Sequence, residues 1–194
     1  MRVIGLCGRS GSGKGLFCGV AKEMGFCIID CDGIYHSLVN APSDCLYELD
    51  REFGSDFTAG GRLDRKRMAE LVFSDPSALK KLNEITHHYV LIEVKKLIAD
   101  DRNYIVDAPT LFESGFDACC DTVIAVIAPD AECIERICAR DGVSAEEAQK
   151  RLSSQKSVDF LIENSDILLY NDSDPKSFED SCRELLAGLA EGAL

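Results

Sequence analysis

The stretch RVIGLCGRSGSGKG, residues 2–15, decides how this chain is expected to fold. Its apolar first part, Arg2–Leu6, predicts a buried strand, and a helix is expected from about Lys14 to Met24. The glycines between them let successive backbone N–H groups point inward at phosphate oxygens, and the helix start adds the positive end of its dipole. The stretch therefore predicts a phosphate-binding loop, in which Lys14 neutralises the β- and γ-phosphates. The residues expected to contact the phosphates are Gly8, Arg9, Ser10, Gly11, Ser12, Gly13, Lys14 and Gly15.

Two features of this loop leave its function open. A glycine-rich turn beside a surface lysine is the alternative that involves no ligand. In addition, Gly15 stands where such loops carry a Ser or Thr whose hydroxyl binds Mg²⁺. A water molecule can replace that oxygen because Mg²⁺ usually keeps several waters, and losing the contact would cost about 1–3 kcal/mol. The chain is therefore a working phosphotransferase, a weakened one, or a protein that only binds nucleotides.

Composition and charge exclude several classes of protein. The 194 residues are 46% hydrophobic and 28% charged, which is typical of one globular domain. The net charge of −13 disfavours binding to nucleic acid, so an anionic ligand needs a local positive site. No apolar run approaches the ~20 residues of a membrane helix, and we expect no signal peptide and a cytoplasmic location. The sequence leaves open a monomer or a weak homo-oligomer.

The ten cysteines predict a reduced protein. None of them is spaced as C-x-x-C, and Cys27, Cys133 and Cys138 lie inside apolar runs. Small buried thiols are therefore expected, rather than disulfides or a zinc site.

The order of elements predicts a three-layer α/β fold of the P-loop NTPase type. Continuously apolar runs predict five parallel strands with helices on both faces. The expected strands are Arg2–Leu6, 26–30, 104–107, 122–128 and 167–170. Further helices are expected at about 130–140 and 144–155 and from Asp174–Pro175 onward, and helical segments fill about 33–98. A single domain is expected, with a nucleotide-binding core (about 1–32, 99–130 and 164–194), a helical lobe (about 33–98) and a lid (about 131–163).

Two helices of this scheme have a predicted buried face. In the helical lobe, Asp75 is expected to cap a helix whose first turn contains Pro76. The face predicted for that helix comprises Leu79, Leu82, Ile85, Tyr89 and Ile92. The face predicted for the last helix comprises Phe178, Cys182, Leu185, Leu186 and Leu189.

Three acidic residues at expected strand ends are candidate catalytic or metal-binding groups. Asp30 and Asp32 are two residues apart, and on a strand both carboxylates would project to one face. Such acids hold Mg²⁺ through water and accept the proton of a hydroxyl group in kinases. The alternative is an ordinary turn, since Asp and Gly commonly end strands. Asp107 closes the third strand in the same way and is a further candidate metal ligand.

A pair of arginines follows the fourth strand. Arg136 and Arg140 are four residues apart and share a helix face other than the one expected to be buried, which comprises Ile134, Ile137 and Cys138. Both would fit a triphosphate as bidentate clamps. The alternative is a solvated face on which Glu132 pairs with Arg136. The three histidines, at positions 36, 87 and 88, show no triad or metal-ligand spacing.

Seven segments in order resemble the dephospho-CoA kinase family over nearly the whole chain. They are IGLCGRSGSGKG (4–15), IDCD (29–32), GGRLDRKRMAELVF (60–73), LNEITH (82–87), DAPTLFE (107–113), RICARDGVSAEEAQKRLSSQ (136–155) and YNDS (170–173). The resemblance implies transfer of the ATP γ-phosphate, with Mg²⁺, to the ribose 3′-hydroxyl of dephospho-CoA. It also implies small-molecule substrates and no nucleic acid or membrane partner.

The resemblance assigns a role to individual residues. Asp32 resembles the general base, and Lys14 and Arg136 resemble the groups that stabilise the transferred phosphoryl. Arg140 resembles a second lid contact to the nucleotide. Further positions match the substrate sites of the family: Arg65 and His87 in the lobe that binds the acceptor, and Asn171 in the loop that approaches adenine. Beside these, the strand-end positions of Asp30 and Asp107 make them the residues expected to hold Mg²⁺, through water.

The chain departs from the family pattern at several of these positions. Gly15 replaces the hydroxyl residue, and Leu161 stands where the family often has Lys or Arg. The other departures are Cys7, Arg9, Thr110 and His88. A weakened homologue that only binds nucleotide or CoA is one alternative. Another nucleoside or nucleotide kinase is a second, although the match over 60–87 argues against it.

Overall fold

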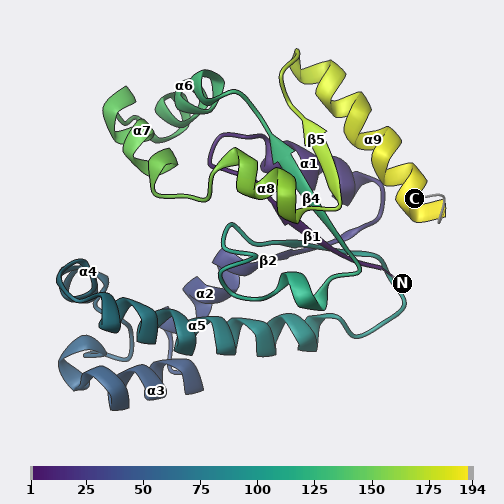
Figure 1. Ribbon diagram of the computed structural model, residues 1–194. Coiled ribbons are helices and arrows are strands. Elements are labelled where there is room, and N and C mark those ends of the chain that lie inside the picture. Colours follow the sequence, from purple (N-terminus) through teal and green to yellow (C-terminus); the bar gives the residue numbers. More distant parts are fainter. Residues whose placement is uncertain (1, 192–194) are drawn as a thin grey trace. The chain divides into compact units, whose positions relative to one another are not determined.

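A five-stranded sheet organises the chain in the computed structural model, which describes residues 2–191 (Figure 1). The strand order is β2-β3-β1-β4-β5, and β1 pairs in parallel with both β3 and β4, as β4 does with β5. The strands are β1 (Val3–Cys7), β2 (Cys27–Asp30), β3 (Tyr104–Asp107), β4 (Thr122–Ile127) and β5 (Ile167–Tyr170). The predicted parallel α/β fold is confirmed, and the third and fifth strands have the predicted limits.

Nine α-helices and two 3₁₀ turns connect the strands within the described residues 2–191. The α-helices are α1 (Lys14–Glu23), α2 (Cys31–Asn40), α3 (Asp44–Phe53), α4 (Arg65–Ser74), α5 (Pro76–Leu97), α6 (Asp130–Asp141), α7 (Ala145–Ser153), α8 (Val158–Asn164) and α9 (Pro175–Glu191). The 3₁₀ turns are η1 (Ser55–Phe57) and η2 (Asp117–Cys119). Helix α8 was not predicted. It has only seven residues and begins where the Ser157 side chain accepts the Phe160 N–H.

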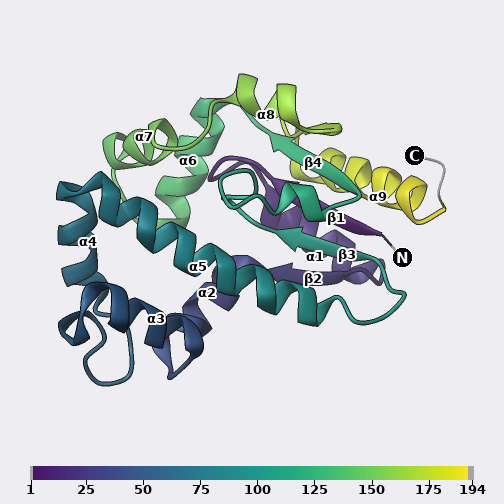
Figure 2. The same ribbon diagram turned by 60° about the horizontal axis from the view of Figure 1, so that its bottom comes forward.

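The chain divides into two compact units, which Figure 2 shows from a second direction. The core unit comprises the residues up to Ile29 and from Asp100 onward, and it contains the sheet. The helical unit comprises Asp30–Ala99.

The core unit is held together by apolar residues of the sheet and of the helices beside it. Strand β1 is buried along its whole length, as expected of a strand covered on both faces. Helices α1 and α9 pack against each other, with α1 on β3, α9 on β5 and α8 on β4. The face predicted for the last helix is confirmed: Phe178, Cys182, Leu186 and Leu189 are buried and Leu185 is partly buried.

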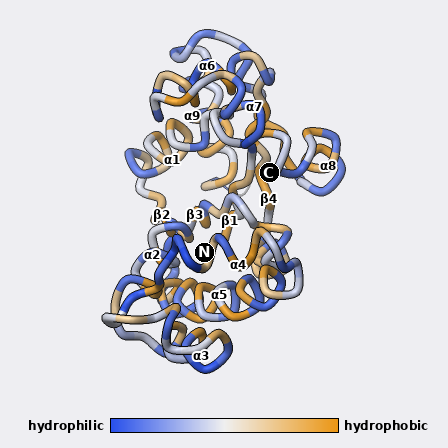
Figure 3. Tube along the Cα trace, turned by 90° about the vertical axis from the view of Figure 1, so that its left-hand side faces the viewer, coloured by the Kyte–Doolittle hydropathy of each residue, from blue (hydrophilic) through white to orange (hydrophobic). Residues whose placement is uncertain are grey.

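The helical unit has its own apolar core around α5. The predicted face of α5 is wrong at its start, because Leu79 is 42% exposed and Ala78 is buried instead. Ala78 precedes Leu82 by four residues and Ile85 by seven, so it continues their stripe, whereas Leu79 lies about 100° further round the helix. Figure 3 shows hydrophobic and hydrophilic residues alternating along this helix. The predicted cap is confirmed: the Asp75 carboxylate accepts the N–H groups of Ser77 and Ala78.

All ten cysteines lie in the described part of the chain, and all are free thiols, as predicted. Five of them are buried: Cys7, Cys31, Cys45, Cys133 and Cys182. Cys27 and Cys138 are only partly buried, and Cys119 is exposed. Within residues 2–191, none of the helices combines the length and the apolar character required to cross a membrane.

Candidate active site

The loop between β1 and α1 has the geometry of an anion-binding turn. Gly8, Gly11 and Gly13 all have positive φ angles, of 146°, 79° and 113°, which side-chain-bearing residues rarely adopt. Close contacts add a second requirement for glycine. A Cβ atom on Gly8 would lie 2.6 Å from the Val126 carbonyl oxygen, and one on Gly11 would lie 2.6 Å from the Cys133 carbonyl oxygen. The sequence therefore has glycine where the loop passes against other backbone.

Lys14 and the first turn of α1 bring positive charge to this loop. The Lys14 ammonium donates a hydrogen bond to the Gly8 carbonyl oxygen at 2.7 Å, so the side chain folds back over the loop. Gly13 is the N-cap of α1 and has no side chain to satisfy the first N–H groups of the helix. An anion bound by the loop would meet these N–H groups, the helix dipole and the Lys14 ammonium.

Arg136 reaches the same loop from α6. One Nη atom donates to the Gly11 carbonyl oxygen at 3.2 Å, and the other donates to the Glu132 carboxylate at 2.6 Å. The pair with Glu132 that the sequence offered as one alternative is therefore present, and Arg136 also lies beside the loop. Arg140 behaves differently, because its guanidinium forms two hydrogen bonds with the neighbouring Asp141. The structure brings Arg136 to the loop and leaves Arg140 engaged on its own helix.

Asn171 contacts the loop from the segment after β5. It follows β5, is 6% exposed, and its amide donates to the Ser12 carbonyl oxygen at 2.8 Å. Its own N–H is bonded to the Ile127 carbonyl oxygen at 2.7 Å, which fixes its backbone at the end of β4. A Cβ atom on Gly13 would collide with the Asn171 amide. This close contact requires glycine at position 13, as its positive φ angle also does.

Asp107 lies at the carboxyl end of β3. Its register partner on β1 is Leu6, so Asp107 ends its strand next to the start of the loop. The Cys18 thiol donates to its carboxylate at 3.7 Å. Ligands of open α/β sheets bind outside this edge, so the position suits a carboxylate that faces a bound nucleotide.

The predicted arrangement of Asp30 and Asp32 on one strand is wrong. Strand β2 ends at Asp30, and α2 begins at the next residue, so Asp32 lies in the first turn of a helix. The cause is local, because the Asp30 carboxylate accepts the Gly33 N–H at 3.0 Å and thereby caps α2. The two carboxylates therefore belong to a strand end and a helix start, and they do not alternate along a strand.

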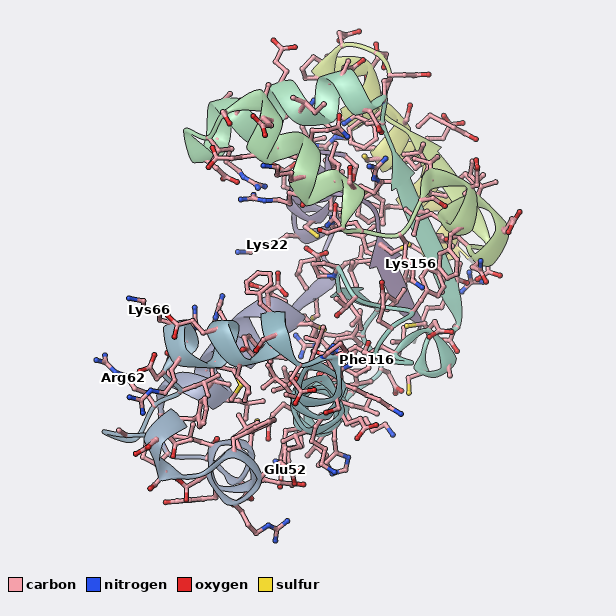
Figure 4. The ribbon with its side chains drawn as sticks, turned by 60° about the vertical axis from the view of Figure 1, so that its left-hand side comes forward. Lys22, Glu52, Arg62, Lys66, Phe116 and Lys156 are labelled. Atoms are coloured by element: carbon pink, nitrogen blue, oxygen red, sulfur yellow. The ribbon has the colours of Figure 1, made fainter. Side chains whose placement is uncertain are left out.

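The helical unit places Arg65 beside a cavity of about 520 Å³. The cavity is lined by Asn40, Ala59, Arg62, Leu63, Asp64 and Arg65. Arg65 also forms a hydrogen bond with the imidazole of His36 on α2. Figure 4 shows Arg62 and Lys66 extending from the same side of this unit. In a chain of net charge −13, this is a local positive surface. His87 lies on α5 and is half-buried, whereas His88 is exposed.

The structure shows the environment of two residues that depart from the family pattern, Gly15 and Leu161. Gly15 is the second residue of α1, is exposed, and no atom lies within 4 Å of the place a Cβ would take. Leu161 is 5% exposed within α8, and it lines a small recess with Cys7 and Gly8. Lys156 lines the same recess, with its ammonium 4.4 Å from the centre of the Phe160 ring.

Comparison with known proteins agrees with this geometry. The model of the dephospho-CoA kinase family matches residues 2–177. The chain belongs to the dephospho-CoA kinase family. A dephospho-CoA kinase of Anaeromyxobacter dehalogenans is 34% identical over 198 residues, which cover 99% of this chain and 94% of that protein. Family membership makes the chain a kinase, that is, a phosphotransferase that uses ATP.

Solved structures of similar proteins agree with this assignment. A dephospho-CoA kinase from Campylobacter jejuni has a TM-score of 0.72 and 26% identity, over 99% of this chain and 98% of that one. The protein TT1252 from Thermus thermophilus has a TM-score of 0.80 and 32% identity, over 98% of this chain and 97% of that one.

Gln155 contacts the loop and was not predicted as a site residue. It stands in the segment between α7 and α8, and its side chain forms hydrogen bonds with both the N–H and the hydroxyl of Ser10. The sequence contained one signal, since Gln155 ends the lid segment that resembles the family. Its contact with the loop depends on residues 145 positions apart, which no local pattern indicates.

A magnesium ion would have few protein ligands at this site. No group of three or more His, Cys, Asp or Glu side chains suited to a metal occurs among residues 2–191. The fit is nevertheless adequate, because Mg²⁺ keeps several waters and binds through one or two carboxylates plus the phosphates of its nucleotide. Asp107, at the carboxyl end of β3, would offer such a carboxylate, whereas Gly15 has no side-chain oxygen to offer.

Proposed function

We propose that this protein transfers the γ-phosphate of ATP to the ribose 3′-hydroxyl of dephospho-CoA. The observation that carries the proposal is the convergence of two cationic side chains, Lys14 and Arg136, on one glycine-rich loop. Phosphoryl transfer requires positioning and positive charge more than covalent chemistry. The loop provides both for a triphosphate, and membership of the family supports dephospho-CoA as the acceptor.

In the proposed reaction, the acceptor hydroxyl attacks the γ-phosphorus of ATP. The bond between that phosphorus and the leaving oxygen of ADP breaks as the new bond to the 3′-oxygen forms. The hydroxyl proton passes to the Asp32 carboxylate, which acts as general base. Lys14 and Arg136 stabilise the negative charge on the phosphoryl oxygens during transfer.

The remaining site residues are proposed to bind and orient the two substrates. Arg140 and Asn171 serve the nucleotide, and Arg65 and His87 serve the acceptor in the helical unit. The segment 131–163 is proposed to act as a lid that excludes water and so limits wasteful hydrolysis of ATP. When bound, Mg²⁺ supplies positive charge to the β- and γ-phosphates. Asp107 and Asp30 are the residues proposed to hold it, through water.

Release of ADP with and without dephospho-CoA tests the proposal. We expect turnover only when ATP, Mg²⁺ and dephospho-CoA are all present. The Asp32→Asn variant is expected to bind ATP nearly as well as the wild type while turnover falls by roughly 10²–10⁴-fold, the usual contribution of a general base. Asp44→Asn is the matched control, since Asp44 lies in the first turn of α3 as Asp32 does in α2. Unchanged turnover in Asp32→Asn would exclude this residue as the base.

A further inference from the structure

Four consecutive residues of the phosphate-binding loop are each held by a side chain from a later part of the core unit. Each contact uses a different partner, and the partners come from α6, from the segment after α7 and from the segment after β5. Arg9 pairs with Asp130, Ser10 with Gln155, Gly11 with Arg136, and Ser12 with Asn171. Two of these partners, Gln155 and Asn171, are uncharged amides. They therefore hold the loop by hydrogen bonds, which have a preferred direction, and add no charge to it.

Gln155 satisfies two polar groups of one loop residue. Its carbonyl oxygen accepts the Ser10 N–H at 3.0 Å, and its amide nitrogen donates to the Ser10 hydroxyl at 3.2 Å. A glutamine side chain offers one acceptor and two donors, which matches this pair of groups. Because the Ser10 N–H points at Gln155, the Arg9 carbonyl of the same planar peptide points the opposite way. That carbonyl accepts the Ser12 N–H at 3.1 Å, which closes the turn of the loop.

Asn171 fixes a second peptide of the loop, the one between Ser12 and Gly13. Its amide donates to the Ser12 carbonyl oxygen at 2.8 Å. In a trans peptide, the C=O and the N–H point in opposite directions. Holding the Ser12 carbonyl outward therefore aims the Gly13 N–H away from Asn171, at the opening of α1 where a phosphate would bind. If this peptide flipped, a carbonyl oxygen would face the phosphate in place of an N–H group.

We propose that Gln155 and Asn171 are positioning residues that keep the phosphate-binding loop in the shape that receives ATP. They act through Ser10 and Ser12, and their effect is to pre-form the loop before the nucleotide arrives. This inference rests on one part of the proposed function, namely that ATP binds at the loop. It does not depend on which acceptor receives the phosphate. It assigns to Asn171 a role at the phosphates, in addition to the nucleotide contact proposed for it.

Binding of ATP by calorimetry, without any acceptor, is the first test. Gln155→Ala is expected to weaken ATP binding by about tenfold or more, because a net hydrogen-bond contribution of this kind lies near one kcal/mol and two such bonds are lost. Gln149→Ala is the matched control, since Gln149 bonds only within α7, to Ser153. For Asn171→Ala the control is Asn164→Ala, whose amide bonds within α8. Both controls are expected to bind ATP like the wild type.

Steady-state kinetics separate a positioning role from a merely structural one. In Gln155→Ala, the KM for ATP is expected to rise about tenfold while the KM for dephospho-CoA stays within about twofold. Wild-type ATP affinity in Gln155→Ala would overturn the proposal, and so would equal rises in both KM values together with a lower Tm.

The outcomes for the two amides and for the enzyme's function remain distinguishable. Asn171 is buried, so Asn171→Ala is scored only if it folds by circular dichroism; Gln155→Ala, at a half-buried position, decides the proposal otherwise. Weakened ATP binding in Gln155→Ala without any turnover of dephospho-CoA by the wild type would support the positioning role and contradict the proposed acceptor. Full turnover of dephospho-CoA by the wild type, together with unchanged ATP binding in Gln155→Ala, would support the proposed acceptor and contradict the positioning role.

Discussion

Replacing Gly15 by serine restores the oxygen that the loop lacks, and we expect it to accelerate the reaction. No atom lies within 4 Å of the position a Cβ would take, so the new side chain enters without displacing a neighbour. An added contact to magnesium or phosphate is worth about 1–3 kcal/mol. Since 1.4 kcal/mol corresponds to a factor of ten, kcat/KM for ATP should rise by roughly five- to 150-fold. The assay is ADP release at saturating dephospho-CoA.

Gly15→Ala separates the oxygen from the effect of the side chain on the helix. Gly15 lies within α1, where either replacement removes the conformational freedom of glycine and should stabilise the fold by up to about 1 kcal/mol. Both variants should therefore show a raised Tm, and only the serine variant should show the faster reaction. Equal kcat/KM in Gly15→Ser and Gly15→Ala would refute the reasoning, because the missing hydroxyl would then carry no part of the rate.

Three further predictions concern stability and thiol chemistry. Leu186 is fully buried in the core unit, so Leu186→Ala should lower the free energy of unfolding in urea by about 2–5 kcal/mol; a loss below about 1 kcal/mol would contradict the packing described. Iodoacetamide at pH 8 should label the exposed Cys119 before Cys120, because burial raises the pKa of the Cys120 thiol to about 12, and peptide mass spectrometry reads the order. Hydrogen bonds from Arg102 and Tyr104 lower the pKa of Asp100 to about 2. The stability that this carboxylate contributes is thus fully present above about pH 4 and is lost as the pH falls through about 2, so Asp100→Asn should lower Tm at pH 7 and lower it much less near pH 2.

Much of the core unit could be predicted because its signals are local. Strands β3 and β5 are continuous apolar runs between polar residues, and their limits are the predicted ones. The phosphate-binding loop was recognisable because its glycines and Lys14 are contiguous in the chain. The cap at Asp75 depends on residues within three positions, so its pattern was also complete in the sequence.

The predictions from the sequence failed in two situations. In one, a single side chain changes the local backbone conformation; in the other, the contact joins residues far apart in the chain. Asp30 uses its carboxylate to start α2, which turns the expected strand position of Asp32 into a helical one. Helix α8 is too short for a helical period to be visible, although the Ser157 cap was a usable signal. The contact between Gln155 and Ser10 joins residues far apart in the chain, and only the folded structure brings them together.

The most direct test of the central claim is to follow the γ-phosphate itself. Purified protein is incubated with Mg²⁺ and ATP labelled in the γ-phosphate, with or without dephospho-CoA, and the labelled products are separated by chromatography. We predict that the label appears in a product that co-elutes with coenzyme A, and only when dephospho-CoA is present. Label that stays in ATP, or that is released as inorganic phosphate at the same rate with and without dephospho-CoA, would contradict the proposed function.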